Sequence, residues 1–441
     1  MTASTDHPPK ALIAEVRVLL ADAAAVSRQL LDHMAEHEFP VELTEDGGTI
    51  GFLTGAAIVR PERDAVGIRV TAVHEAGLAY IKSVMASHLI EFATGQHLQI
   101  EWTGDGADAT VFPNFREMTV TRVLDLSPKM RRISLSGQNL ESFATGGLHI
   151  KLFVPPAGVT EPEWPVPGKD GLAIWPPDDK RPSVRTYTIR NIDAAAGTIE
   201  VDFVIHADED GSHGVGAGWA MGAKAGDLVG VRGPIGRPVP NADWYLLVGD
   251  ETALPAIARH LEAVPGSARG IALIEIDSES DQQNIAHPGI EVRWLYRNGA
   301  EPGTTTLLID AVRAVEMPPQ DTAVYAFAGV EEAAFTAIRH HWLLASRESR
   351  RRVKPWGRSG PHGHVGQISR VPAPKSTAAP RGSRIGWAGW RVAAGLPHAW
   401  RTGPRGQPVR HHRNCAGRPG RLRRQGSVHR CLMRTGWAPP S

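Results

Sequence analysis

The sequence predicts a multidomain protein, in which a small α+β module, an antiparallel β-barrel and an α/β domain with a parallel sheet precede an irregular basic tail. Three observations predict this class. The length of 441 residues exceeds one ordinary domain. Residues 116–240 contain almost only short strand patterns, whereas strands and helices alternate from Asp243 on. Hydrophobic periodicity disappears after Gly357, so we place the parts at 1–110, 111–240, 241–357 and 358–441.

The first module spans residues 11–104 and contains no catalytic set. Helical patterns cover 23–37 and 78–95, and short alternating runs cover 41–55 and 67–76. The Gly- and Asp-containing stretch 101–115 is typical of a linker. We interpret His74 and His88 as structural residues and Glu75 as an acid at a helix start. A structural or regulatory role is expected for this module.

The second part predicts a barrel because six short strands follow one another between turn-rich segments. They are expected at 118–127, 130–137, 148–156, 184–191, 198–206 and 227–234, with one helix near 218–227.

The third part alternates strands with helices. Strands are expected within 243–249, 268–276, 290–297 and 322–329, and helices near 255–264, 305–315 and 331–344. Such repeated units predict a parallel sheet, whose ligands bind at the carboxyl ends of its strands.

The tail differs from the rest of the chain in composition. Residues 349–441 hold 20 of the 48 Lys and Arg but no Asp or Glu, which leaves 28 basic against 47 acidic residues elsewhere. A disordered segment and a nucleic-acid-binding arm both have such a composition. We favour a third interpretation, a shifted reading frame of a GC-rich gene. We expect no nucleic-acid partner, since the basic and aromatic residues show no positional regularity.

The positions of the cysteines and the hydropathy of the chain exclude several kinds of site. Both cysteines, Cys415 and Cys431, lie in the tail, so the body has no disulfide, thiolate nucleophile or cysteine-ligated cluster. Their spacing does not match a structural zinc site, and we predict no metal site. Redox chemistry would therefore come from an organic cofactor. The N-terminus lacks a signal-peptide pattern and no long apolar run exists, so we expect a cytoplasmic protein without membrane insertion.

The stretch RPSVRTYTIRN, residues 181–191, combines strand-forming residues with cationic ones. It is either a solvated edge or the holder of an anionic, aromatic ligand. Arg185, Tyr187 and Ile189 share one face of a strand, and Thr188 and Arg190 share the other. Arginine suits phosphate because its planar fork binds in bidentate fashion.

A glycine-rich loop follows the next strand and precedes a helix pattern. Its glycines are Gly211, Gly214, Gly216 and Gly218. Glycine lets the backbone approach a ligand closely, and the N–H groups of a helix start attract a diphosphate. Alone the loop is weak support, but after the Arg-x-Tyr-Thr-x-Arg strand it becomes more specific.

Residues 116–357 resemble the siderophore-interacting protein family, flavin-dependent ferric-siderophore reductases of the ferredoxin reductase superfamily. The resemblance rests on the Arg-x-Tyr-Thr-x-Arg strand, on Asp-Phe-Val-x-His at 202–206, on the segment 214–220 and on the unbroken GDETALPAI at 249–257. The first module resembles an uncharacterised domain sometimes fused before such proteins. The chain departs from the family at VKPWG, residues 353–357, which Arg358 and Ser359 follow where relatives have a Tyr-Trp pair.

The resemblance implies that FAD reduces a ferric siderophore with electrons from NADPH or NADH and that Fe(II) is released. No catalytic side chain is needed. Implied cofactor contacts are Arg185, Tyr187, Thr188, Arg190, Asp202, His206, Gly214, Gly216, Ala217, Trp219, Ala220, Gly249, Asp250, Glu251, Thr252, Ala253, Arg297, Gly329 and Glu331. For a cationic surface that receives the anionic chelate we predict Lys354, Arg339 and Arg347.

Several of these residues have a second interpretation. Asp250, Glu251 and Thr252 are also expected to cap the helix that begins near Pro255. His206 is either structural or close to the flavin. Arg297 either reaches the phosphate of NADPH or is a solvated residue at a strand end. Val330 separates Gly329 from Glu331, where the family has a Gly-Glu turn.

Two alternative functions stay open. One is a reductase of the same superfamily with another acceptor, such as a protein or a quinone; the acidic body disfavours an acidic ferredoxin. The other is a protein that binds a siderophore or flavin without turnover.

Overall fold

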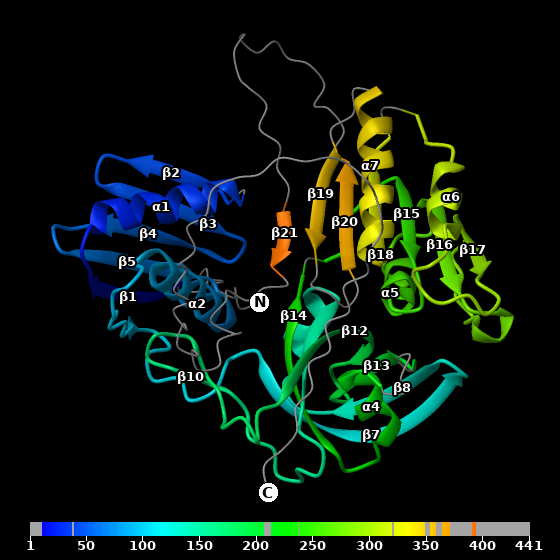
Figure 1. The fold of residues 1–441 in the computed structure, drawn as a ribbon, viewed down its shortest axis with the longest axis horizontal. Coiled ribbons are helices and arrows are strands. Elements are labelled where there is room, and N and C mark those ends of the chain that lie inside the picture. Colours follow the sequence, from blue (N-terminus) through cyan, green and yellow to red (C-terminus); the bar gives the residue numbers. More distant parts are fainter. Residues whose placement is uncertain are drawn as a thin grey trace, which may run out of the picture. The chain divides into compact units, whose positions relative to one another are not determined.

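The computed structural model describes residues 11–37, 39–206, 213–236, 238–319, 322–348, 353–358, 364–370 and 390–393, and beyond Trp342 only their secondary structure (Figure 1). Its strands form a six-stranded sheet, a small hairpin, a closed barrel and a seven-stranded sheet. The predicted fold class is therefore confirmed. Among the described helices, none has the length and apolar character required to span a bilayer.

The N-terminal module is a sheet with two helices. Its elements are β1 (Leu12–Leu19), α1 (Ala23–Glu36), β2 (Val41–Thr44), β3 (Gly47–Phe52), β4 (Gly55–Pro61), β5 (Ala65–Ala72), α2 (Glu75–Phe92) and β6 (Thr103–Gly104). The antiparallel order is β2-β3-β4-β5-β1-β6. Alternate residues of β1 are buried and exposed, so one face of the sheet carries the core that α1 and α2 cover.

The sequence patterns missed parts of this module. We expected no strand at β1 or β4, and the stretch 101–115 was predicted to be a linker. That prediction was wrong for Thr103 and Gly104, because β6 pairs with Ala14 and Glu15 at the edge of the sheet. A strand of two residues has no periodicity, so only its pairing partner reveals it.

All six predicted barrel strands are present. They are β7 (Phe115–Ser127), β8 (Met130–Ser136), β9 (His149–Val154), β12 (Ser183–Asp193), β13 (Thr198–Val204) and β14 (Leu228–Ile235), closed in the order β12-β13-β8-β7-β14-β9. Short elements between them are α3 (Glu141–Thr145), β10 (Val166–Pro167), β11 (Ala173–Ile174) and α4 (Val215–Gly222). Inward apolar residues such as Ile150, Leu152 and Val201 fill the barrel. Helix α4 begins three residues before the predicted start at Gly218.

The third part is the predicted parallel sheet. It contains β15 (Trp244–Gly249), α5 (Leu254–Ala263), β16 (Arg269–Ile276), a 3₁₀ turn at Glu279–Asp281, β17 (Ile290–Tyr296), α6 (Leu307–Arg313), β18 (Val324–Val330) and α7 (Glu332–Glu348). Strands β17, β16, β15 and β18 lie side by side and parallel. The chain runs outward from β15 to β17 and then returns to the other side of β15. The topological switch point therefore lies between β15 and β18.

Three further strands extend this sheet. They are β19 (Val353–Arg358), β20 (His364–Arg370) and β21 (Trp390–Ala393). Strand β20 pairs antiparallel with β18 and with β19, and β21 pairs with β19. Two short strands thus occur in the segment that was expected to be irregular, and the rest of that segment after residue 358 lies outside the described residues.

The barrel and the parallel sheet share a core. Met130 of β8 packs in the same buried cluster as Tyr245 of β15 and Leu254 of α5. Ser127 donates a hydrogen bond to Asp281 across this boundary (2.8 Å). Helix α5 also packs against β12, where Arg259 donates to the carbonyl oxygen of Ile189 (2.8 Å) and the candidate site begins.

Candidate functional site

Strand β12 presents its two faces as the alternation predicts. Tyr187 and Ile189 pack with the barrel core, whereas Thr188 is buried with its Oγ1 3.2 Å from Nδ1 of His149 on β9. The strand has an irregular register between Ile189 and Asn191, so Arg190 lies at a bulge. Its guanidinium binds Glu262 of α5 (2.8 Å). Arg185 is half-buried and donates to the carbonyl oxygen of Val184 (2.9 Å).

An aromatic row leads from Tyr187 to helix α4. The ring centre of Tyr187 is 4.3 Å from that of Phe203, which is 5.5 Å from Trp219 of α4. Burial raises the pKa of Tyr187 to about 12, so its hydroxyl is protonated at neutral pH. A Cβ at Gly216 would overlap the Tyr187 hydroxyl and lie 3.1 Å from the ring carbon that carries it. The first turn of α4 therefore rests directly on this tyrosine.

The start of α4 carries no side-chain cap from the part of the chain that the structure describes. Gly214 is the N-cap, and a Cβ at Gly214 would meet no described atom within 4 Å. Ala217 and Ala220 are buried beneath this turn. Backbone N–H groups at an uncapped helix start attract anions. Residues 207–212, including Gly211, lie outside the described residues.

Two predicted residues of β13 differ in their surroundings. Asp202 is buried, and both of its carboxylate oxygens accept hydrogen bonds from Arg132 of β8 (2.7 and 2.9 Å). The carboxylate therefore binds a neighbouring strand of the barrel. The same hydrogen bond raises the pKa of Arg132. His206 is exposed, and its carbonyl oxygen accepts a hydrogen bond from His213 (2.6 Å).

The switch point of the sheet gathers the second predicted group. Gly249 of β15 pairs in register with Gly329 of β18. Both strands lie close to the start of α5, because a Cβ at Gly329 would be 2.7 Å from Cβ of Ala253, and one at Gly249 would overlap it. Asp250 follows Gly249 and accepts hydrogen bonds from the backbone N–H (2.8 Å) and hydroxyl (2.6 Å) of Thr252. The switch point therefore carries polar side chains next to its glycines.

The predicted side-chain cap of α5 was wrong. Ala253 is the N-cap and no side chain caps the helix; the carbonyl oxygen of Asp250 accepts from the N–H groups of Ala253 and Leu254 instead. Burial, with the charges of Glu251 and Glu331, raises the pKa of Asp250 to about 6. The segment Asp250–Thr252, which was predicted to cap α5, is instead a turn that desolvates the carboxyl group of Asp250.

Arg297 is neither solvated nor free. Its side chain is 1% exposed and binds Glu251 through both terminal nitrogens (2.9 and 2.5 Å), with Glu275 at 3.6 Å. Thr305 donates to the other oxygen of Glu275 (2.9 Å). The guanidinium therefore fixes Glu251 in the turn after β15.

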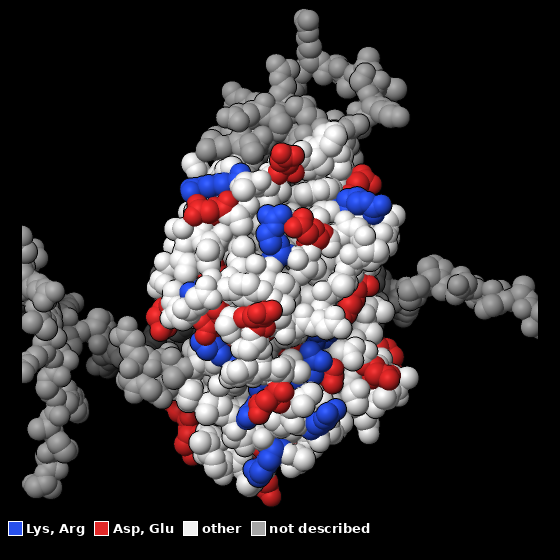
Figure 2. All heavy atoms as spheres, turned by 90° about the vertical axis from the view of Figure 1, so that its right-hand side faces the viewer, with Lys and Arg blue, Asp and Glu red and all other residues white. Residues whose placement is uncertain are grey.

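The predicted cationic surface is described only in part. Arg339 is exposed on α7, whereas the side chains of Arg347 and Lys354 lie outside the described residues. Figure 2 shows the face around α6 and β17, where basic and acidic side chains are interspersed without a large patch of one sign. That face does not itself favour an anionic substrate.

Sequence reasoning missed several polar residues between β12 and α5. His149 is half-buried beside Thr188, and desolvation with the charge of Lys151 lowers its pKa to about 4. Arg259 donates to the carbonyl oxygen of Ile189 (2.8 Å). The alternation of His149 and Lys151 with apolar residues was the available signal. No sequence signal pointed to Arg259, because its contact with β12 forms only when α5 packs against the barrel.

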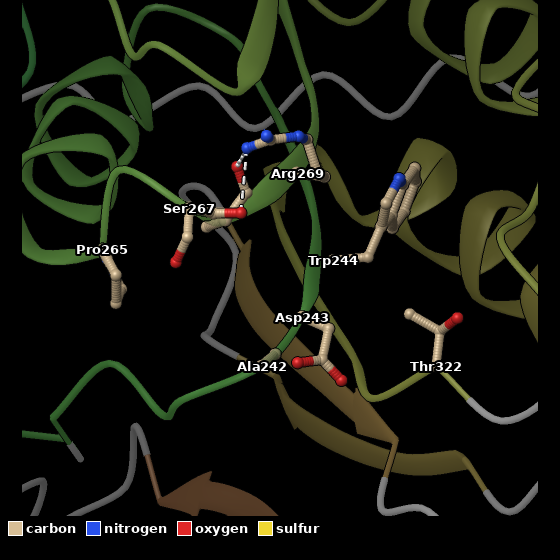
Figure 3. A pocket seen from close by; sticks show the side chains of 8 residues that line it. Ala242, Asp243, Trp244, Pro265, Ser267, Arg269 and Thr322 are labelled. Carbon is tan, nitrogen blue, oxygen red and sulfur yellow. Dashed lines mark hydrogen bonds between the residues drawn. The ribbon is translucent and has the colours of Figure 1, made fainter.

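A pocket of about 470 Å³ lies at the other end of the parallel sheet. It is lined by Ala242, Asp243, Trp244, Pro265, Ser267, Ala268, Arg269 and Thr322. Figure 3 shows Arg269 folded back onto the carbonyl groups of Ser267 and Ala268. Trp244 and Arg269 are the first residues of their strands, so this pocket is remote from the carboxyl ends.

The residues around β12 fit a flavin nucleotide. Among the described residues, Arg190 has a buried Nε without a hydrogen-bond partner, so it can still donate to a ligand. The glycine at 216 leaves room where any Cβ would collide with Tyr187. Together with the uncapped start of α4, these features offer an aromatic surface and donors for a diphosphate.

Comparison with known proteins agrees with this fit. Residues 119–238 match the siderophore-interacting FAD-binding domain, and residues 242–357 match the siderophore-interacting protein model. The chain is 33% identical over 237 residues to the ferric vibriobactin reductase of Vibrio cholerae, covering 51% of this chain and 83% of that protein. The chain belongs to the siderophore-interacting protein family.

Other relatives of this siderophore-interacting protein match about half of the chain or less. An NADPH-dependent ferric-chelate reductase of Escherichia coli is 37% identical over 196 residues, covering 41% of this chain and 71% of that one. A solved siderophore utilization protein from T. fusca is 35% identical, with a TM-score of 0.44, covering 54% of this chain and 89% of that chain. Residues 15–103 match an uncharacterised protein conserved in bacteria. The matched domains identify FAD as the cofactor of the barrel and support an oxidoreductase.

Proposed function

We propose that this protein reduces ferric siderophores in the cytoplasm, using FAD and either NADPH or NADH, and releases Fe(II). One observation carries the proposal. A helix start without a side-chain cap rests on a partly buried tyrosine, Tyr187, in the FAD-binding barrel, and that barrel shares a core with a parallel sheet. The names of the Vibrio cholerae and Escherichia coli relatives support a ferric chelate as the substrate.

The barrel residues hold the flavin. Tyr187 offers its ring and a protonated hydroxyl, and Arg190 offers a buried Nε. The N–H groups of the first turn of α4, at Gly214, Gly216 and Ala217, face the diphosphate. Arg185, Thr188, His206, Trp219 and Ala220 complete the proposed contacts. Asp202 acts indirectly, because Arg132 binds its carboxylate.

The switch point holds the nicotinamide dinucleotide. Gly249 and Gly329 let the ligand approach the strand ends, and Asp250, Thr252, Ala253 and Glu331 follow these glycines in the chain. Arg297 acts through Glu251, whose position in the turn it fixes.

The reaction needs an electron carrier between nicotinamide and Fe(III), because the two exchange different numbers of electrons. Nicotinamide gives up two electrons as a hydride, whereas Fe(III) accepts one, and bound FAD supplies the chemistry that joins them. Protein side chains bind, orient and exclude water, and none acts as a nucleophile. Arg339, Arg347 and Lys354 remain the proposed contacts of the anionic chelate.

The test is anaerobic release of Fe(II) from a ferric siderophore, followed with a ferrous chelator. We expect release only when FAD and NADPH or NADH are both present. At a limiting concentration of FAD, Arg190→Ala should slow the release, and Arg293→Ala, on the exposed side of β17, should not. Unchanged release by Arg190→Ala would refute the proposed flavin contact. A parent protein that binds FAD and releases no Fe(II) would refute the proposed reaction.

A further inference from the structure

The N-terminal module binds the tip of the β10–β11 hairpin, residues 168–172, which belongs to the barrel part of the chain. Trp102, just before β6, donates its backbone N–H to the carbonyl oxygen of Lys169 (3.0 Å) and its indole Nε1–H to that of Asp170 (2.9 Å). Leu172 packs against the apolar core that the module's sheet and helices enclose. A residue from the barrel part therefore completes the core of the module.

The backbone of the hairpin tip is shaped for this contact. Gly171 has a φ of +80°, in the left-handed region that favours glycine. Its N–H donates to the carbonyl oxygen of Gly168 (2.8 Å), which closes the turn. A Cβ at Gly171 would lie 3.2 Å from Cβ of Lys82 on α2 and 3.4 Å from Nε1 of Trp102. The tip and the module are thus in close contact, with little room for a side chain between them.

On the side of the module, a buried lysine supports the contact. Lys82 is 6% exposed, and its Nζ donates to the carbonyl oxygen of Gly106 (3.0 Å) and lies 5.8 Å from the ring centre of Trp102. The lysine therefore ties the segment around Trp102 to α2. An additional ion pair, Lys169 with Glu101 (3.2 Å), is exposed on both sides and contributes little.

The hairpin belongs to the long connection between β9 and β12, residues 155–182. Trp175, directly after β11, stacks on Phe153 of β9 with the ring centres 6.1 Å apart. The guanidinium of Arg181 lies 4.5 Å from the ring centre of Trp175. Phe153 is paired in register with Val184 of β12. The connection therefore packs on the barrel at the start of the strand that carries the proposed flavin contacts.

Ordering such a connection costs conformational entropy. Long connections with little regular structure of their own are uncommon in compact domains and usually have a function. Here the module binds the hairpin tip, and the chain continues from that tip into β12. Restraint of the tip removes part of the freedom of the chain that leads into β12, so less freedom remains to be lost when FAD binds to this strand.

We propose that the N-terminal module is a positioning module for the flavin site, which strengthens the binding of FAD by holding the hairpin tip, residues 168–172. The inference rests on the proposed flavin contacts of β12, but it does not depend on the ferric substrate. Coupling between two binding events is reciprocal. FAD therefore also strengthens the hold of the module on the tip.

Titration calorimetry of the full-length protein, freed of flavin, with FAD tests the first half of this coupling. We expect Gly171→Ala and Leu172→Ser to weaken FAD binding about fivefold or more. Gly158→Ala is the matched control for the glycine, since it lies in the same connection with φ +82° and its Cβ would meet no described atom within 4 Å. Ile174→Ser, at an exposed position of β11, is the control for the leucine. Both controls should bind FAD as the parent does.

Hydrogen exchange followed by mass spectrometry tests the reciprocal half. FAD should slow the exchange of α2 and of the segment around Trp102 in the parent and in Ile174→Ser. In Leu172→Ser the exchange of these segments should not respond to FAD. A contact that only stabilises the module would change their exchange equally with and without FAD.

Two results would overturn the proposal. One is equal FAD affinity of Leu172→Ser and Ile174→Ser, and the other is exchange of α2 in the parent that does not respond to bound FAD. Far-ultraviolet circular dichroism checks that the variants fold, and Leu172→Ala provides a milder change. Release of Fe(II) enters neither measurement, so failure of the proposed reductase reaction would be seen separately.

Discussion

At the candidate flavin site, the hydroxyl of Tyr187 restricts which residue can stand at position 216. Gly216 lies so close to the hydroxyl of Tyr187 that no side chain can be placed there without a shift. Tyr187 cannot retreat easily, since Phe203 packs against its ring at 4.3 Å. Glycine at 216 is therefore required by a side-chain contact as well as by the need for exposed backbone N–H groups.

Gly216→Ala should weaken FAD binding by at least about tenfold, because the added methyl group displaces either α4 or Tyr187. Fluorescence quenching of FAD measures the affinity. Gly222→Ala is the matched control on the same helix, since a Cβ there would meet no atom within 4 Å. Combining Gly216→Ala with Tyr187→Phe should restore part of the affinity, because the overlapping oxygen is removed. If the double variant binds no better than Gly216→Ala alone, the contact is not the cause.

The Asp250 carboxyl group at the switch point makes the stability of the folded protein depend on pH. The folded protein raises the pKa of its carboxyl group from 3.8 to about 6, so the folded state binds this proton more tightly than the unfolded chain does. The charged carboxylate therefore destabilises the folded state above pH 6. This effect disappears below the unfolded pKa, near 4.

Asp250→Asn should therefore be more stable than the parent above pH 6 and equally stable below about pH 4. A shift of this size corresponds to at most about 3 kcal/mol, and the half-buried position reduces the expected gain to about 2 kcal/mol. The amide keeps the oxygen that accepts from Thr252. Urea unfolding between pH 4 and 8, without ligands, measures the difference. A gain that stays constant over this range would contradict the assigned pKa.

Among the secondary-structure elements, the parallel sheet is held at its carboxyl edge by one buried cation. Arg297 follows β17, Glu275 belongs to β16, and Glu251 lies in the turn between β15 and α5. One guanidinium thus joins three neighbouring strand ends. Its distance from Glu251, 2.5 Å at the closest, and its burial make this pair sensitive to the loss of either partner.

Arg297→Ala should lower the free energy of unfolding by about 3–5 kcal/mol, because it leaves two buried carboxylates without a cation. Arg293→Ala is the control, since Arg293 binds Glu291 on the exposed side of β17 and such pairs contribute about 0–1 kcal/mol. Chemical denaturation compares the two. Similar losses would mean that the pair contributes no more than a surface contact. Dinucleotide binding should also weaken in Arg297→Ala, as Glu251 loses its fixed position.

Across the whole molecule, the flavin barrel and the parallel sheet are connected through Arg190. This residue of the proposed flavin site binds Glu262 of α5, while Arg259 of the same helix binds the backbone of β12. Helix α5 starts at the switch point and ends beside the flavin barrel. Flavin binding and the position of the dinucleotide domain are therefore expected to influence each other.

Arg190→Ala should weaken FAD binding at least about tenfold, because a charge-assisted donor is lost. Glu262→Gln should instead strengthen FAD binding about two- to threefold, since Arg190 no longer shares its charge with a partly exposed carboxylate. Isothermal titration calorimetry measures both affinities. Weaker binding by Glu262→Gln, to the extent seen for Arg190→Ala, would show that the pair positions Arg190 rather than competes for it.

The sequence by itself determined the order of the parts, all six barrel strands, the two faces of β12 and the glycines at both proposed ligand sites. These follow from local periodicity and from motifs in which neighbouring residues act together. Only the tertiary structure decided which side chains and strands pair with one another. Arg297 was expected in solvent or on a phosphate and instead binds Glu251, 46 residues away in the chain. Strand β6 and the contact of Trp102 with Asp170 likewise depend on segments that meet only after folding. Burial and pairing are properties of position in space, and no local pattern encodes the partner that a distant segment brings.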